Sequence, residues 1–270
     1  MCILLVFESY KQVKGGEYMA FLQPDRVYDA YGVKVKQYFI TEHNPNRIQL
    51  PQRRTKPLIG LCLHNTNDIR EAAGTTDPEQ YVRSTINGNM GTVRVHFYVD
   101  DDEAWQMLPL DWQSWHSGQA GRKDANGSEA GNAQTISIEC IEEKGQDAKN
   151  AKAEDNAARL IAYLLDTFCM TADDNLYTHN YWCNVRNGKK GTLWELNRLY
   201  DGYKGCPIFI RPHWAEFMNK VKGYMKPAAD IKPKAKYFVQ VGAFADKAKA
   251  EAYLNAVKKY YPDAFIKVIE

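Results

Sequence analysis

A short apolar segment that stops abruptly on polar residues constrains this chain more than any other feature. Five small or apolar residues, 59–63, precede His64, Asn65 and Thr66. A continuous apolar run of this length predicts a strand buried on both faces of a sheet. Open α/β sheets gather ligand-binding and catalytic groups where such strands end. Taken alone, His64 is an ordinary hydrogen-bonded histidine, so its role depends on the residues that other segments place beside it.

Three later segments supply chemically versatile side chains. Residues 135–141 form a second apolar run, and it carries Glu139 in its middle. A carboxylate in a buried strand is costly to desolvate and therefore needs a partner or a catalytic role. Residues 176–182 are predicted to be a short strand that carries His179, and residues 203–207 to be a tight loop that holds Cys206 before a proline.

Two histidines and one cysteine are a plausible ligand set for catalytic zinc, which takes three protein ligands and leaves a fourth position open. His64, His179 and Cys206 are far apart in the chain, however, and form no compact motif. Other cysteines could compete, and satisfied core histidines are common. From the residues alone, both a metal site and an ordinary core remain open.

The remaining pattern predicts the fold class. Asp77 followed by Pro78 is typical of a helix start, and residues 150–170 repeat apolar side chains at the spacing of an amphipathic helix. Residues 93–99 alternate as a strand, the acidic residues 100–103 form a turn, and residues 104–107 form the return strand. We therefore expect an α/β fold with a central mixed β-sheet flanked by helices.

Composition narrows the classes of partner. Lys and Arg number 35 against 33 Asp and Glu, a net charge of +2, which argues against nucleic acid as the main partner. No run approaches the roughly 18 apolar residues of a membrane span, so no membrane insertion is expected. The scattered cysteines favour free thiols and synthesis in the cytoplasm. The apolar amino terminus lacks a basic leading region and a small-residue cleavage site, so no signal peptide is predicted. Residues 1–18 are interpreted as a leader outside the fold, with Met19 as the start.

From about Met19 to Met225 the chain resembles the zinc-dependent N-acetylmuramoyl-L-alanine amidases. This family includes amidase-type phage endolysins and is related to the peptidoglycan recognition proteins. The resemblance rests on six segments that match in order: Leu63-His64-Asn65-Thr66, Val95-His96-Phe97, Trp115-His116-Ser117-Gly118, Ile136-Ser137-Ile138-Glu139, Thr178-His179 and Lys204-Gly205-Cys206-Pro207.

The resemblance implies a zinc ion held by His64, His179 and Cys206. It also implies that Glu139 is the general base and that Lys204 stabilises the developing oxyanion. Some relatives have a catalytic tyrosine at the position of Val95, so its absence here places more weight on Glu139.

Two further residues are assigned around this set. We expect His116 to line the substrate cleft and Trp115 to form an aromatic wall. The strand pattern favours a structural role for His96.

The implied activity is hydrolysis of the amide between N-acetylmuramic acid and L-alanine in bacterial peptidoglycan, by a phage or prophage endolysin that acts on the cell wall after release. The alternative is a non-catalytic peptidoglycan-recognition protein, as some relatives are once a metal ligand is lost. Because all three ligand positions are filled, the sequence favours the enzyme.

The composition changes after the predicted catalytic domain, residues 19–226. Residues 227–235 form a linker rich in Pro, Ala and Lys, and residues 236–270 are predicted to be a strand-helix-strand unit. This small β-α-β unit resembles one repeat of the sporulation-related (SPOR) type, which binds cell-wall glycan. Such domains normally contain two copies. The single copy here could pair with a second chain as a homodimer, dock on the amidase or be a remnant, and we favour pairing.

Overall fold

The computed structural model describes residues 10–12, 18–20, 22–66, 77–117, 130–200 and 205–226, together with residues 251 and 254. The chain divides into two compact units, Met1–Pro227 and Ala228–Glu270. In the second unit the two described residues, Glu251 and Leu254, are helical. The rest of the predicted β-α-β unit lies outside the described residues, as does most of the predicted leader. The proposed boundaries of the domains remain predictions.

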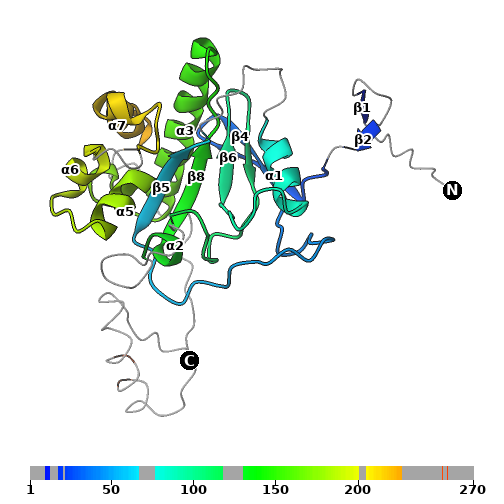
Figure 1. Ribbon diagram of the computed structural model, residues 1–270, viewed down its shortest axis with the longest axis horizontal. Coiled ribbons are helices and arrows are strands. Elements are labelled where there is room, and N and C mark those ends of the chain that lie inside the picture. Colours follow the sequence, from blue (N-terminus) through cyan, green and yellow to red (C-terminus); the bar gives the residue numbers. More distant parts are fainter. Residues whose placement is uncertain are drawn as a thin grey trace, which may run out of the picture. The chain divides into compact units, whose positions relative to one another are not determined.

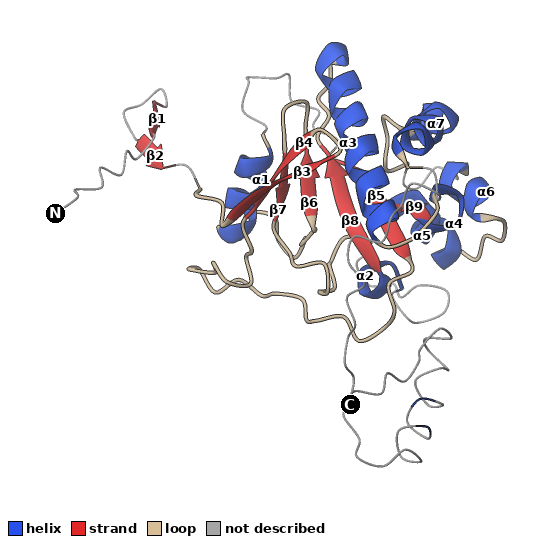
Figure 2. Ribbon diagram, turned by 180° about the vertical axis from the view of Figure 1, so that it is seen from behind, coloured by secondary structure: helices blue, strands red, loops and turns tan. Residues whose placement is uncertain are grey.

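Among the described residues of the first unit, seven strands form one mixed sheet in the order β3-β4-β7-β6-β8-β5-β9 (Figure 1 and Figure 2). β5 lies between β8 and β9 and is parallel to both. The strands are β3 Arg26–Ala30, β4 Val33–Gln37, β5 Gly60–Asn65, β6 Phe97–Val99, β7 Ala104–Gln106, β8 Thr135–Cys140 and β9 Leu176–Thr178.

Helices cover both faces of this sheet. Figure 2 shows α3 running along one face in front of the strands, with α7 beside it, whereas in Figure 1 the sheet hides part of α3. The helices are α1 Pro78–Ile86, α2 Ala130–Gln134, α3 Asp147–Thr167, α4 Ala172–Asn175, α5 His179–Arg186, α6 Leu193–Arg198 and α7 Trp214–Tyr224, which follows a 3-10 turn η1 Arg211–His213. The predicted α/β class is confirmed.

The two faces of the sheet have separate cores. Alternate residues of β5 and β8, among them Leu61 and Ile136, pack with the apolar side chains of α3 and α7. Tyr98 of β6 and Trp105 of β7 belong instead to a second core that contains Val82 of α1. Successive residues of a strand point to opposite faces of the sheet. The residues of β5 and β8 that alternate with the core residues on the α3 side therefore point to the face away from α3.

Local sequence signals account for most of these elements. The Asp77 side chain accepts a 2.7 Å hydrogen bond from the backbone N–H of Gln80, so it caps α1 as predicted. The amphipathic helix predicted over residues 150–170 is α3, which begins and ends about one turn earlier, at Asp147 and Thr167. The predicted hairpin is β6 paired antiparallel with β7, although β6 covers only Phe97–Val99 of the strand predicted over residues 93–99. The Asp100 carboxylate accepts from the turn backbone.

One hairpin was not predicted. β3 pairs antiparallel with β4, and the connecting residues Tyr31 and Gly32 have φ values of 55° and 90°. Two consecutive positive φ angles are typical of the tight turn that joins twisted strands. The sequence signal is a lone glycine after a tyrosine, which is weak.

Residues within the predicted leader also contribute described strands. β1 Tyr10–Gln12 pairs antiparallel with β2 Tyr18–Ala20 as a separate two-stranded sheet. Because β2 extends beyond residue 18, this ladder crosses the predicted boundary of the leader.

Candidate metal centre

His64 reaches the site because of its place in β5. Leu61 and Leu63 pack into the core on the α3 side, so His64 points to the opposite face of the sheet. Its ring is almost completely buried, with 1% of the residue exposed.

His179 lies at the junction of β9 and α5. The sequence predicts a strand over residues 176–182, but β9 ends at Thr178 and a helix begins at His179. The reason is a cap: the Thr178 hydroxyl accepts a 3.0 Å hydrogen bond from the backbone N–H of Tyr181. The histidine therefore occupies the first helical position, next to the end of β5.

Cys206 belongs to the loop that precedes η1, and two other segments hold this loop. The carbonyl of Cys206 accepts a 2.8 Å hydrogen bond from the backbone N–H of Asn180. The amide oxygen of Asn65 accepts from the backbone N–H groups of Phe209, at 3.1 Å, and Ile210. The residues that follow His64 and His179 in sequence thus position the cysteine.

The side chains of His179 and Cys206 converge on the Nδ1 atom of His64. The Nδ1 atom of His64 lies 3.2 Å from Nδ1 of His179 and 3.7 Å from Sγ of Cys206. All three potential ligand atoms lie within 4.8 Å of one another. The structure therefore brings together the three residues that were predicted to bind a metal.

These separations fit the coordination of zinc. With usual zinc–nitrogen and zinc–sulfur bond lengths, a tetrahedral ion holds two nitrogen ligands about 3.3 Å apart and a nitrogen and a sulfur about 3.6 Å apart. Both values are close to those between the side chains of His64, His179 and Cys206. Two imidazoles and one thiolate leave a fourth position for water or substrate, as in catalytic zinc sites.

Glu139 lies beside this cluster because β8 is parallel to β5 and pairs His64 with Glu139. Paired residues of neighbouring strands point to the same face, and the Oε1 atom of Glu139 is 3.8 Å from Nδ1 of His64. The glutamate side chain keeps 15% of its surface exposed. A carboxylate in this position can reach both the metal-ligand cluster and a molecule that enters from solvent.

The remaining predicted residues are placed differently. Trp115 is half-buried and pairs by backbone hydrogen bonds with Arg94. His116 is 7% exposed, and its ring packs edge-on against the ring of His64. Their predicted contacts with substrate remain predictions. Lys204 lies outside the described residues.

Burial controls the charge of two nearby histidines. Removal from water, assisted by the guanidinium groups of Arg186 and Arg54, lowers the pKa of His116 to about 3. The pKa of His96 is also lowered well below its ordinary value by burial. The Nε2–H group of His96 donates to the carbonyl of Trp112, and its Nδ1 atom accepts from the backbone N–H of Ser137, which agrees with the structural role expected for it.

A polar support that the sequence does not predict lies beneath the site. The Asn65 amide donates a 2.7 Å hydrogen bond to Oε1 of Glu142, whose residue is 1% exposed. Burial and the nearby Glu154 raise the pKa of Glu142 to about 8. Asn65 thus links the cysteine loop to the segment after β8. The only signal in the sequence is that an asparagine directly follows His64.

Comparison with known proteins identifies the family. Residues 54–192, half of the chain, match the family described as N-acetylmuramoyl-L-alanine amidase. The chain belongs to this family. Residues 233–270 match the SPOR domain. Family members generally depend on zinc, and the described residues include a candidate His/Cys site for such an ion.

Individual relatives agree with this assignment. The chain is 28% identical to the N-acetylmuramoyl-L-alanine amidase CwlH of Bacillus subtilis over 74% of its length and 66% of the relative. It is 34% identical to the amidase XlyA of the same species over 66% of its length and 54% of the relative. The chain therefore spans about half to two thirds of these curated relatives.

Solved structures show the same fold. The catalytic domain of XlyA aligns with a TM-score of 0.50 at 27% identity, over 70% of this chain and 99% of that domain. A mutant endolysin from Bacillus subtilis aligns with a TM-score of 0.51 at 28% identity over the same shares. Among the described residues of this amidase family member, no helix has the length and apolar character needed to cross a membrane.

Proposed function

We propose that this chain is a zinc-dependent amidase that hydrolyses the bond between N-acetylmuramic acid and L-alanine in bacterial peptidoglycan. The observation that carries the proposal is the convergence of two histidine nitrogens and a cysteine sulfur beside the Glu139 carboxylate. Membership of the amidase family supports the same reaction.

His64, His179 and Cys206 would hold zinc through the three atoms that face one another. Bound zinc supplies Lewis-acid chemistry, since it polarises a carbonyl and makes water more acidic. The backbone N–H of Asn180 donates to the carbonyl of Cys206, and the backbone N–H of Phe209 donates to the amide oxygen of Asn65. These two hydrogen bonds keep the cysteine loop against both histidines. This support fixes the position of the thiolate before substrate arrives.

Glu139 is proposed to accept a proton from the attacking water and to return it to the leaving amine of L-alanine. A general base must lie within reach of the proton it removes, and Glu139 combines proximity to His64 with partial exposure. Val95, at the position where some relatives have tyrosine, is fully buried in the second core, the one that contains Val82 of α1. Glu139 is therefore the proton carrier that we assign.

Lys204 and Trp115 complete the proposed active site. Lys204 precedes Cys206 by two residues, and its ammonium group would stabilise the oxyanion that develops on the substrate carbonyl. Trp115 is half-buried in the loop that also carries His116, so its indole is proposed as a wall against the sugar or peptide.

The SPOR match at residues 233–270 suggests how the enzyme is retained on its substrate. We propose that this unit binds cell-wall glycan and pairs with a second copy. The protein would then act as a phage or prophage endolysin that is synthesised in the cytoplasm and reaches the wall after release. Sedimentation of the full chain and of a version that ends near Met225 tests the pairing, because equal monomeric masses would exclude it.

A non-catalytic peptidoglycan-recognition protein is the rival function. It is disfavoured because each of the three ligand positions carries a side chain able to bind zinc. Loss of one ligand would have favoured recognition over catalysis.

Digestion of purified cell walls distinguishes the two functions. The enzyme should expose new amino termini of L-alanine, a metal chelator should abolish their release, and added zinc should restore it. Walls that bind the protein but release no amino termini at any zinc concentration would favour the recognition protein. The Glu139→Gln variant serves as the catalytic control in each digestion.

A further inference from the structure

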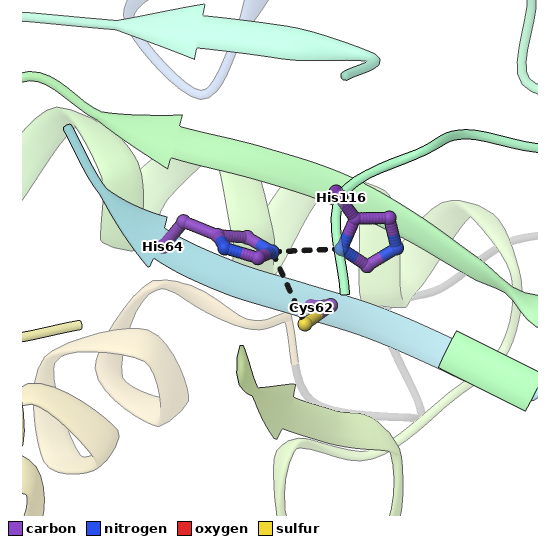
Figure 3. Close-up of side chains that lie close together, drawn as sticks. All are labelled: Cys62, His64 and His116. Atoms are coloured by element: carbon purple, nitrogen blue, oxygen red, sulfur yellow. Dashed lines mark hydrogen bonds between the residues drawn. The ribbon is translucent and has the colours of Figure 1, made fainter. Parts of the chain in front are cut away.

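His64 uses both nitrogens of its ring, and the second one faces away from the proposed metal ligands. Its Nε2 atom lies 2.7 Å from Nδ1 of His116 and 3.4 Å from Sγ of Cys62 (Figure 3). The two rings meet edge-on at an interplanar angle of 85°. His116 comes from a loop 52 residues further along the chain, so this contact exists only in the folded protein.

The far side of His116 determines which nitrogen carries hydrogen. Nε2 of His116 lies 3.1 Å from the carbonyl oxygen of Gly131 and 3.2 Å from Oγ1 of Thr135. The Thr135 hydroxyl gives its own hydrogen to the same carbonyl, at 2.6 Å. Both partners of Nε2 are therefore acceptors, and a neutral His116 must carry its hydrogen on Nε2.

The tautomer of His64 follows from that of His116. In a neutral imidazole one nitrogen donates and the other accepts. Nδ1 of His116 is thus an acceptor, and the 2.7 Å contact requires that Nε2 of His64 donate to it. The lone pair of His64 is left on Nδ1, the atom that faces His179 and Cys206.

The loop that carries His116 is itself held against α2. The side-chain oxygen of Asn132 accepts from the backbone N–H groups of His116 and Ser117, both at 2.9 Å. A Cβ atom on Gly131 would lie 2.0 Å from Oγ of Ser117. Only glycine allows this approach, which brings the Gly131 carbonyl to the His116 ring.

We propose that His116 is a positioning residue that holds His64 in the tautomer and ring orientation required to bind a metal through Nδ1. The proposal rests on the proposed function in so far as His64 is a zinc ligand. Hydrogen bonds of this kind to the second nitrogen of a ligating histidine fix the ring and raise the basicity of the ligand. Here the acceptor is a neutral histidine and the chain ends on a backbone carbonyl.

A second metal site formed by Cys62, His64 and His116 fits the distances less well, although the three side chains lie close together. Two nitrogens bound to one zinc ion would be about 3.3 Å apart, whereas those of His64 and His116 are 2.7 Å apart. That separation is characteristic of a hydrogen bond.

The first test measures the tautomers directly in the metal-free protein. Long-range proton–nitrogen correlation spectra of nitrogen-labelled histidine should show both His64 and His116 with hydrogen on Nε2, with His116→Asn and His64→Asn variants used for assignment. Hydrogen on Nδ1 of His64 would overturn the proposal. This measurement needs no substitution in the protein from which the tautomers are read.

The second test measures zinc affinity by competition with a chromophoric chelator. His116→Leu removes the acceptor, and we expect about 10- to 100-fold weaker binding. His116→Asn places an amide oxygen near the lost Nδ1 and should recover part of the affinity. His96→Leu is the matched control, because His96 is also a buried histidine bonded to a backbone carbonyl. It should lower the unfolding temperature without weakening zinc binding by the folded protein.

The outcomes separate this inference from the proposed function. Parent protein that binds no zinc would overturn both the proposed metal site and the positioning role. Parent protein and His116→Leu that bind zinc equally well would overturn the positioning role alone. Protein that binds zinc in the expected tautomer but releases no L-alanine termini from walls would overturn only the proposed reaction.

Discussion

The two faces of strands β5 and β8 show how one sheet can serve both stability and chemistry. Towards α3 these strands present the fully buried apolar residues Leu61, Leu63, Ile136 and Ile138. Towards the other face the same strands present Cys62, His64, Ser137 and Glu139. Among these, His64 and Ser137 take part in buried hydrogen bonds.

The difference shows that the two faces are held together by different interactions. On the α3 face, stability comes from removing apolar surface from water. On the opposite face, each buried polar group needs a partner, since an unsatisfied one costs about 1–3 kcal/mol. Substitutions on the first face should therefore change stability, whereas substitutions of His64 or Glu139 on the second face should change metal binding or catalysis.

The largest expected effect is on the catalytic face. Glu139→Gln keeps the size of the side chain but removes the base, so the rate of wall cleavage should fall by about 10²–10⁴-fold. Zinc affinity and the unfolding temperature should remain near those of the parent. A variant that retains the parent rate would contradict the role of Glu139 and would move the proton transfer to another group.

The apolar face should respond in the opposite way. Ile136→Ala creates a cavity in the α3 core, and the free energy of unfolding should fall by about 2–5 kcal/mol. Ile136→Val is the graded control and should cost about 0.5–1.5 kcal/mol. Urea unfolding gives these values, while wall digestion at low temperature should give a nearly unchanged rate for the folded protein. A large loss of rate would show that the two faces are coupled.

The polar support at Glu142 should make stability depend on pH. Its pKa is raised from 4.5 to about 8, so the folded protein holds a proton that the unfolded chain releases. This contribution is complete below about pH 4.5 and is lost as the pH rises to 8. Each pKa unit corresponds to about 1.4 kcal/mol, so the effect amounts to a few kcal/mol.

Glu142→Gln should remove most of that dependence, because the amide keeps an oxygen that can accept from Asn65. Urea unfolding of parent and variant between pH 5 and 8 is the measurement. The variant should become the more stable protein towards pH 8. Parallel stability curves over this range would show that the carboxyl titrates normally.

The smallest expected effect is at Cys62, which shares the polar face but is not assigned as a ligand. Its Sγ atom lies 3.4 Å from Nε2 of His64, whereas Sγ of Cys206 lies 3.7 Å from Nδ1, so Cys62 faces the nitrogen on the opposite side of the ring. Cys62→Ala should leave zinc affinity unchanged and cost roughly 1 kcal/mol of stability. Tenfold weaker zinc binding would instead assign a ligand to the Cys62 side of His64.

Local patterns were sufficient for much of the fold. Three signals each lie within a single helix or strand and are visible without tertiary structure: the Asp77 cap, the apolar stripe of α3 and the two apolar strands. The β3–β4 hairpin was missed because its turn rests on a single Tyr-Gly pair. The extent of β9 was overestimated because the Thr178 cap is as compatible with a strand end as with a helix start.

The sequence by itself determined which side chains are available: two histidines and a cysteine near predicted strand ends, and a glutamate inside an apolar strand. Only the tertiary structure decided how they meet. The strand order β8-β5-β9 places Glu139 and His179 on either side of His64, and the loop held by α2 brings His116 to its second nitrogen. A contact between residues 52 positions apart depends on the packing of distant segments, and no local pattern records that packing.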